Sequence, residues 1–222
     1  MIPAALLDTC SPPTRDMLAK SLEGRRLSAA EALHLLQATG RDYQALLLTA
    51  NEVCERARGQ RVSFVVCRNI NFTNQCTNTC RFCAFSVPVG HAGSFFFSLD
   101  DIKAKVREAV DRGCTEVCIQ GGLHPDLTLQ SYLDILQAVR SVAADIHIHA
   151  FSPEEVRHAS LQSDMACADV LGAFKAAGLN SMPGTAAEIL VDAVRRKLCP
   201  DKLTAGQWRE IVTTAHRLGI PS

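Results

Sequence analysis

After about residue 60, the sequence alternates between short apolar segments and longer amphipathic segments, and this alternation constrains the fold more than any other feature. The apolar segments are typical of strands and cover residues 61–73, 115–120, 145–150 and 179–182. Helical periodicity covers residues 98–112, 129–142, 153–161, 166–177, 186–197 and 205–218. Each connection between successive strands is long enough to hold a helix, so the strands would run parallel. The pattern predicts an α/β fold, either a (βα) barrel or an open doubly wound sheet.

The predicted βα units number about four, which is too few to close a barrel. The chain ends at residues 219–222, where a fifth strand would be expected to begin. A parallel sheet of this size would leave one edge and much of its inner face uncovered. We therefore expect an incomplete barrel, such as a truncated gene product, an artificial fragment or one half of a split enzyme would form.

A helical extension is predicted before the barrel, so that residues 1–60 form one region and residues 61–222 the other. The first 25 residues show no clear period, and we expect them to be frayed. Ser28 and Glu31 have the spacing of a capping box at the start of a helix. A second helix is predicted from Asp42 to Arg58, with Gly59 as its stop signal.

Charge and hydropathy argue against two classes of partner. Lys plus Arg number 23 and Asp plus Glu number 23, which gives no electrostatic basis for binding nucleic acid or an anionic membrane. No apolar run approaches the length of about 18 residues that a transmembrane helix needs. The N-terminal residues carry charges and prolines instead of the apolar run of a signal peptide. We therefore expect a cytoplasmic protein whose ten cysteines are reduced.

Cys76, Cys80 and Cys83 form a C-x3-C-x2-C motif directly after the first predicted strand. Thiolates on one short loop can reach three corners of a four-iron cluster, whereas iron–sulfur clusters normally take four cysteines. The fourth iron would then be open to a ligand that is activated there. The spacing matches the signature of the radical-SAM family, whose members bind S-adenosylmethionine at that iron and cleave it to a 5′-deoxyadenosyl radical. The resemblance implies a [4Fe-4S] cluster and S-adenosylmethionine as cofactors, and it places Phe82 close to the adenine.

Other interpretations of the cysteines remain open. The three cysteines could bind zinc together with His91, although zinc sites usually place a second ligand pair about a dozen residues after the first. They could also be unconnected core residues. Most of the remaining cysteines are interpreted as small buried hydrophobic residues, and they are Cys10, Cys54, Cys67, Cys114, Cys118, Cys167 and Cys199.

Polar residues occur near the ends of the predicted strands, where βα barrels place their chemistry. Because side chains alternate along a strand, Asn69 and Asn71 share one face and would point into the lumen. His147 and His149 share a face of the third strand in the same way. For this histidine pair, a functional role and a structural role have equal support.

Two further segments are candidates for binding a ligand. Gln120 is followed by Gly121 and Gly122, and paired glycines allow a ligand to approach the backbone or simply form a turn. Radical-SAM proteins use a Gly-Gly-Glu segment here to bind the methionyl amine. Leu123 replaces the acid, so only the backbone role of the glycines carries over. Glu188 is expected in the first turn of the following helix, where a substrate contact and a capping role are equally supported.

Four motifs extend the resemblance within the radical-SAM family, and they are NINFTN at 69–74, QGGLHP at 120–125, HIHAFSP at 147–153 and PGTAAEIL at 183–190. Over about residues 28–222 the chain resembles the FO synthase group, and in particular its tyrosine-transferring subunits. The resemblance implies a partial TIM-type barrel. It also implies a transferase that couples the 4-hydroxybenzyl part of L-tyrosine to 5-amino-6-(D-ribitylamino)uracil on the route to FO and coenzyme F420.

The same resemblance implies partners and alternatives. The polar residues expected to hold the substrates are Asn69, Asn71, Gln120, His147, His149 and Glu188. A reductant protein is an implied partner, and the ring-closing FO synthase subunit is a candidate partner. Aminofutalosine synthase, the cyclic dehypoxanthine futalosine synthase of menaquinone biosynthesis and the ring-closing subunit itself share most of the motifs. Because half a barrel is missing, an inactive cluster-binding fragment is an alternative from another class.

Overall fold

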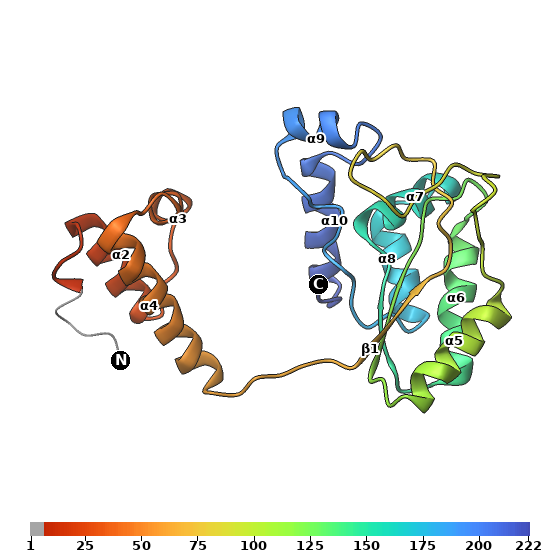
Figure 1. Ribbon diagram of the computed structural model, residues 1–222, viewed down its shortest axis with the longest axis horizontal. Coiled ribbons are helices and arrows are strands. Elements are labelled where there is room, and N and C mark those ends of the chain that lie inside the picture. Colours follow the sequence, from red (N-terminus) through yellow and green to blue (C-terminus); the bar gives the residue numbers. More distant parts are fainter. Residues whose placement is uncertain (1–6) are drawn as a thin grey trace. The chain divides into compact units, whose positions relative to one another are not determined.

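The computed structural model describes residues 7–222, which divide into two compact units at the Phe64–Val65 bond (Figure 1). The described helices of the N-terminal unit are α2 (Pro12–Leu22), α3 (Ala29–Leu36) and α4 (Gly40–Arg58). The predicted capping box is present at α3, because the hydroxyl of Ser28 accepts the N–H of Glu31 and the Glu31 carboxylate accepts the N–H of Ser28.

The expectation that the first 25 residues are frayed is wrong for Pro12–Leu22, which form α2; residues 1–6 lie outside the described residues. The start of α2 is held by Asp42 in the first turn of α4. The backbone N–H of Ser11 donates to the Asp42 carboxylate at 2.9 Å, and the Thr14 hydroxyl donates to it at 2.8 Å. The sequence alone does not reveal these contacts, since the partner lies about 30 residues away.

The C-terminal unit is an α/β fold whose strands β1 (Cys67–Asn71), β2 (Glu116–Gln120) and β3 (His147–Ala150) form a parallel sheet in that order. Asn69 pairs with Cys118, which pairs in turn with His149. The helices of this unit are α5 (Leu99–Asp111), α6 (Leu129–Val142), α7 (Pro153–Ser163), α8 (Cys167–Ala176), α9 (Asp192–Leu198) and α10 (Ala205–Arg217). The predicted class, a partial TIM-type barrel after a helical region, is confirmed.

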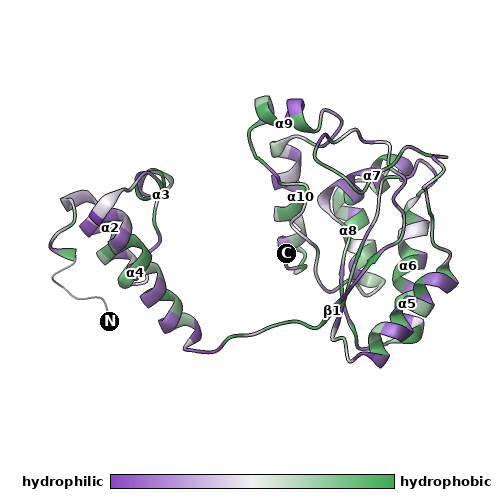
Figure 2. Cartoon of the chain, in the orientation of Figure 1, coloured by the Kyte–Doolittle hydropathy of each residue, from purple (hydrophilic) through white to green (hydrophobic). Residues whose placement is uncertain are grey.

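One face of the sheet is packed against helices and forms the core. Ile70, Ile119 and Ile148 point to this face and are at most 1% exposed. Apolar residues of α5, α6, α7, α8 and α10 join the same buried cluster. Figure 2 shows hydrophobic and hydrophilic residues alternating along α5 and α6, as helices with one buried face require. Burial of each large apolar side chain contributes about 1.5–3 kcal/mol, so this face sets the orientation of each strand.

The first strand is shorter than the predicted segment 61–73. The strand ladder begins at Cys67, opposite Glu116, the first residue of β2. Before it, the carbonyl of Val66 still accepts the N–H groups of Thr115 and Glu116, but residues 61–65 pair with no strand among the described residues. Val62 and Phe64 are 92% and 86% exposed. The composition of this segment favours a strand, but the segment does not have the paired neighbour that a strand needs.

The fourth predicted strand, 179–182, is reduced to a single bridge between Ser181 and His149. The carbonyl of Ser181 accepts the N–H of Ala150 at 3.0 Å, so the segment occupies the position of a fourth strand. Its ladder stays short because the side-chain oxygen of Asn180 accepts the N–H of Ile148 at 2.8 Å in place of a backbone carbonyl. Pro183 follows and has no N–H to continue the ladder.

The helix predicted over residues 186–197 begins later, at Asp192. Ala186 and Glu188 have φ values of 65° and 35°, in the left-handed region that a helix excludes. The guanidinium of Arg195 donates to the carbonyls of Ala186, Ala187 and Ile189 and thereby holds this segment in an irregular loop. No helix within residues 7–222 has the length and apolar character needed to cross a membrane.

The prediction that most cysteines outside the motif are buried is wrong. Among them, Cys10 and Cys199 are buried. Cys54 and Cys67 are exposed, and the others are intermediate. Cys67 and Cys118 lie on the sheet face opposite the helical core, so neither becomes part of the packed interior.

Candidate functional site

A cavity of about 360 Å³ opens where β1 and β2 end. The predicted site residues that line it are Asn71, Cys76, Cys80, Phe82, Cys83, Gln120, Gly121, Gly122 and Glu188. Asn69, His147 and His149 lie outside this set. The structure therefore brings the cysteine loop, the glycine pair and part of the predicted polar set to one place.

The cysteine loop is fixed by hydrogen bonds to several segments. The N–H of Cys76 donates to the carbonyl of Val87 at 3.0 Å, and the N–H of Thr77 donates to that of Leu123 at 3.0 Å. Before the loop, the buried side chain of Asn74 accepts the N–H of Phe95 at 2.8 Å. These bonds tie the loop to the segment after β2 and to the segment before α5.

The three loop cysteines carry free thiols, and their surroundings shift the pKa values of Cys80 and Cys83 in opposite directions. Burial raises the pKa of Cys80 to about 11, although the nearby charge of Lys202 works in the opposite direction. Burial also acts to raise the pKa of Cys83, but hydrogen bonds from Ser86 and the backbone, together with Lys202, hold that pKa below its usual value. Because iron binds the thiolate, metal binding at Cys80 would have to displace a firmly held proton.

The donor arrangement fits a cluster better than a zinc ion. Within residues 7–222, no three His, Cys, Asp or Glu side chains stand close enough to hold one metal ion. His91, the fourth zinc ligand considered above, accepts the N–H of Gly93 with its Nδ1 at 3.0 Å. A cubane offers a separate iron to each thiolate, whereas zinc must draw all its ligands within about 2.3 Å of one centre. Three thiols that line the same cavity suit the cubane.

The glycine pair lies where the protein itself leaves no room for a side chain. A Cβ on Gly122 would lie 2.2 Å from the carbonyl oxygen of Gln75 and 3.0 Å from the Cβ of Cys76. A Cβ on Gly121 would lie 2.5 Å from the ring of Phe72. These glycines therefore let the cysteine loop pack against the end of β2. Their contact with a cofactor stays a prediction.

A buried carboxyl group, which the sequence interpretation missed, stands beside Gly121. Glu155 is 1% exposed, and its side chain accepts the N–H of Gly121 at 3.0 Å and that of Ser152 at 2.7 Å. Burial raises the pKa of Glu155 to about 7, despite the hydrogen bonds that favour its charged form. The signal was present in the sequence, since Ser152 and Glu155 have capping-box spacing at the start of α7.

A second missed feature is the segment between α9 and α10, which lies against the cysteine loop. The N–H of Arg81 donates to the carbonyl of Leu198 at 2.8 Å, and the N–H of Thr79 donates to the Asp201 carboxylate at 3.1 Å. The ammonium of Lys202 lies 5.3 Å from the centre of the Phe82 ring. These contacts join residues about 120 positions apart, so no local pattern announces them.

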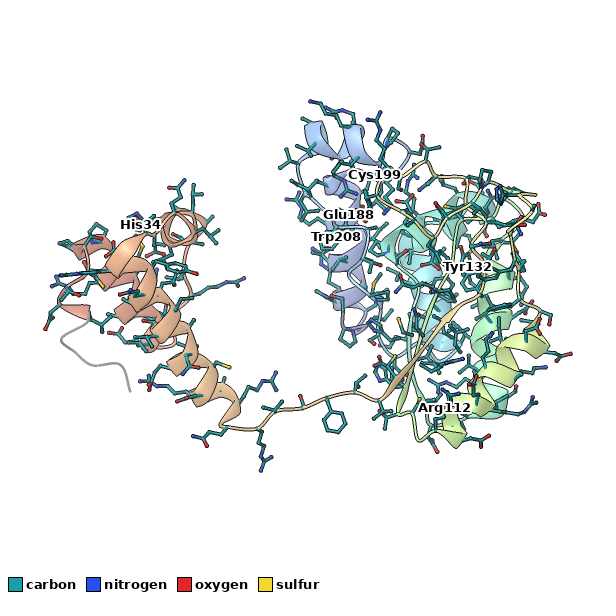
Figure 3. All side chains as sticks on the ribbon, in the orientation of Figure 1. His34, Arg112, Tyr132, Glu188, Cys199 and Trp208 are labelled. Atoms are coloured by element: carbon teal, nitrogen blue, oxygen red, sulfur yellow. The ribbon has the colours of Figure 1, made fainter. Side chains whose placement is uncertain are left out.

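Glu188 lines the cavity, but its predicted place in the first turn of a helix is wrong. It lies in the irregular loop before α9, and its carboxylate is 2.7 Å from the ammonium of Lys202 and 3.7 Å from the guanidinium of Arg195. Figure 3 shows Glu188 near Cys199 and Trp208, beside α10. The Trp208 indole holds the same loop by donating to the carbonyl of Thr185 at 3.0 Å.

The histidine pair forms a separate polar group on the open face of the sheet. The Ser181 hydroxyl lies 2.7 Å from Nε2 of His147 and 2.6 Å from Nδ1 of His149. Burial holds the pKa of His149 below its ordinary value, which favours the neutral imidazole. Asn69 is exposed on the same face. A role of these residues toward substrate stays a prediction.

Comparison with known proteins identifies the family. The sequence model of the Radical SAM superfamily matches residues 70–222. The chain belongs to the radical SAM superfamily. Members of this superfamily use a [4Fe-4S] cluster and S-adenosylmethionine, the two cofactors that the cysteine motif predicts.

Curated relatives narrow the resemblance of this radical SAM chain. A 5-amino-6-(D-ribitylamino)uracil--L-tyrosine 4-hydroxyphenyl transferase of Methanothermobacter thermautotrophicus is 43% identical over 209 residues, which cover 94% of the chain and 57% of the relative. A protein of the same name from Archaeoglobus fulgidus is 54% identical over 173 residues, covering 78% of the chain and 49% of the relative. These names confirm the predicted resemblance. The chain spans about half the length of the curated relatives it matches.

Solved structures show the same architecture. The crystal structure of HydG, a maturase of the [FeFe]-hydrogenase, aligns with a TM-score of 0.73 at 13% identity and covers 96% of the chain and 46% of HydG. Methylornithine synthase (PylB) aligns with a TM-score of 0.63 at 18% identity and covers 92% of the chain and 56% of PylB. At these identities, the likeness shows that the radical SAM fold is shared.

Proposed function

We propose that this chain carries the cofactor-binding half of a radical SAM transferase that couples the 4-hydroxybenzyl part of L-tyrosine to 5-amino-6-(D-ribitylamino)uracil. The substrates follow the names of the relatives, and the place of the reaction in FO and coenzyme F420 biosynthesis follows the resemblance described above. The observation that carries the proposal is a single cavity lined by three free cysteines and by the Gly121–Gly122 pair.

In this proposal Cys76, Cys80 and Cys83 hold the [4Fe-4S] cluster. When bound and reduced, the cluster supplies the electron that cleaves S-adenosylmethionine. The backbone of Gly121 and Gly122 and the ring of Phe82 line the cavity beside these thiols, where the methionyl and adenine parts of the cofactor would lie. The volume of about 360 Å³ lies within the range of cavities that bind small molecules.

The polar residues divide into two groups with different access to this cavity. Asn71, Gln120 and Glu188 line it, which supports a contact with a ligand beside the cluster. Asn69, His147 and His149 lie on the same open face of the sheet but toward the start of the strands. We assign the first group to the substrate part nearest the radical and the second group to the remote part of a substrate.

The proposal includes a working environment. A cluster of this kind needs a protein reductant, and reduced thiols are kept in the cytoplasm, which we propose as the compartment. The ring-closing FO synthase subunit is proposed as a partner that receives the product. Each of these partners would meet the complete enzyme, of which this chain matches about half.

One observation favours a second candidate, a fragment that binds the cluster without turnover. The chain covers 57% and 49% of these two relatives, and the side chains on the sheet face that bears Asn69 and His149 are exposed or only partly buried. Residues that complete the substrate site would then have to come from elsewhere.

Anaerobic reconstitution with iron and sulfide distinguishes the candidates. The chain is reduced with dithionite and supplied with S-adenosylmethionine, L-tyrosine and the ribitylaminouracil, and 5′-deoxyadenosine and the coupled product are measured. Formation of both supports the transferase. A brown protein that releases no 5′-deoxyadenosine supports the cluster-binding fragment. A colourless protein that binds one zinc ion contradicts both.

A further inference from the structure

A lysine lines the same cavity as the three cysteines. The ammonium of Lys202 lies 5.3 Å from the centre of the Phe82 ring, and Phe82 stands between Cys80 and Cys83 in the loop. A cation at this distance from an aromatic face is attracted by the ring. The contact places a positive charge beside the segment that carries the proposed cluster ligands.

Hydrogen bonds from two residues of the cysteine loop fix the chain segment that carries this lysine. Asp201, the preceding residue, accepts the N–H of Thr79 at 3.1 Å. The carbonyl of Leu198 accepts the N–H of Arg81 at 2.8 Å. The chain segment around Lys202 is therefore hydrogen-bonded to the cysteine loop. These bonds fix the position from which the flexible lysine side chain extends.

A carboxylate holds the lysine at its charged end. Glu188 lies 2.7 Å from the Lys202 ammonium and 3.7 Å from the Arg195 guanidinium, so two cations share one anion. Arg195 is 2% exposed and also donates to the carbonyl of Leu203, next to Lys202. The group of Glu188, Lys202 and Arg195 thus carries a net positive charge. Of the three, Glu188 and Lys202 line the cavity, together with the carboxyl groups of Glu154 and Glu155.

We propose that Lys202 is the cation that raises the reduction potential of the cluster, with Glu188 as the positioning residue that holds it and offsets part of its charge. The inference rests on the proposed function, since it assumes the cluster at Cys76, Cys80 and Cys83. Reduction adds one negative charge to a group already made negative by three thiolates, so a nearby positive charge favours the reduced form. Lys202 is assigned no contact with reacting atoms, and the substrate contact proposed above for Glu188 plays no part in a measurement made without substrate.

Two substitutions test the sign of this effect. K202M removes the cation and should lower the midpoint potential, with the constant for cluster reduction falling about tenfold, which is about 59 mV for one electron. E188Q removes the offsetting anion and should raise the potential. K202R keeps the charge and should stay near the wild-type value. K197M removes an exposed charge on α9 and is the matched control, which should leave the potential unchanged.

The measurement is an anaerobic redox titration of the reconstituted chain, with the electron paramagnetic resonance signal of the reduced cluster as the readout. Shifts of opposite sign for K202M and E188Q support the proposal, because both substitutions break the same ion pair and simple loosening would move both potentials in one direction. Shifts of the same sign, or none, overturn it.

If K202M does not retain a cluster, E188Q decides alone, and anything other than a positive shift overturns the inference. A wild-type chain that binds no cluster overturns the proposed function as well, whereas one that releases 5′-deoxyadenosine without opposite shifts overturns the inference alone.

Discussion

The carboxyl group of Glu155 and the backbone N–H of Gly121 are joined at 3.0 Å, so the first turn of α7 is bonded to the end of β2 directly below the cysteine loop. The Glu155 carboxyl group is buried, and burial, which disfavours its charge, raises its pKa to about 7 from an ordinary value of 4.5. Glu155 is therefore a titratable group that supports the site through a bond to the backbone and not through the cysteines.

Stability should therefore depend on pH through Glu155. Between pH 4.5 and pH 7 the folded chain binds more protons at this carboxyl than the unfolded chain does, so the free energy of unfolding should fall as pH rises through this window. The shift corresponds to a loss on the order of 3 kcal/mol, complete above about pH 7. Urea unfolding at several pH values, under reducing anaerobic conditions, measures it.

E155Q is the decisive variant for this prediction, since the amide cannot titrate. It should remove the fall in stability between pH 4.5 and pH 7 and leave the opposite slope of His149 and His158, whose pKa values burial holds below 6.5. E210Q, at an exposed position of α10, should keep the wild-type profile. A fall in stability with rising pH that survives in E155Q would show that another group causes it.

The close packing at Gly122 makes a second prediction. G122A would place a Cβ 2.2 Å from the carbonyl oxygen of Gln75, so the cysteine loop must move. We expect a destabilisation of about 1–3 kcal/mol, as overpacking typically costs, and loss of most cluster-bound iron. Iron content after anaerobic reconstitution and the urea midpoint are the measurements.

The matched control for this substitution is G172A in α8, where an added Cβ meets nothing within 4 Å. Because alanine favours a helix over glycine, G172A should keep its iron and gain up to about 1 kcal/mol of stability. Equal iron content in G122A and G172A would mean that the loop tolerates the displacement.

Substitution of a loop cysteine should abolish cluster binding, whereas substitution of a cysteine outside the loop should not. C76A, C80A and C83A should each remove the visible iron–sulfur absorption, because each thiolate is assigned to a different iron. C54A, at an exposed position in α4, should reconstitute like the wild type. Retention of the full absorption in any loop variant would remove that cysteine from the proposed ligand set.

The bond between Thr79 and Asp201 should protect the cluster. Thr79 donates its N–H and its hydroxyl to the Asp201 carboxylate, and these bonds hold the pKa of Asp201 below its usual value. D201N and T79V should each lose iron faster to a chelator than the wild type does. The double variant should lose iron no faster than D201N, because both substitutions remove the same contact. Additive rates would indicate that the two residues act independently.

The sequence predicted features whose cause is local. The cysteine spacing and the strand–helix alternation needed only neighbouring residues, and so did the capping box at Ser28. Side-chain alternation also placed Asn71 correctly on the cavity side of β1. In each case the determining pattern lies within one segment.

The features that the sequence did not predict depend on side-chain contacts that no regular pattern of residues announces. The helix expected from residue 186 is prevented by Arg195, whose guanidinium takes the carbonyls of the loop before α9. Asp201 and Lys202 reach the site by folding back over about 120 residues of chain. Periodicity carries no information about such contacts, since their geometry exists only after the βα units have packed.

The polar side chains on the open face of the sheet share one chemical property, which is that each can either donate or accept a hydrogen bond. Its amide, imidazole and hydroxyl side chains are Asn69, Asn71, Gln120, His147, His149 and Ser181. Each of them can act as donor or acceptor, by turning an amide, exchanging an imidazole tautomer or rotating a hydroxyl. The face can therefore reverse its hydrogen-bonding polarity without moving the backbone, so a ring with alternating carbonyl and amine groups could be accommodated in more than one orientation. Selection of a single orientation would then depend on shape and on the charged groups near the cluster.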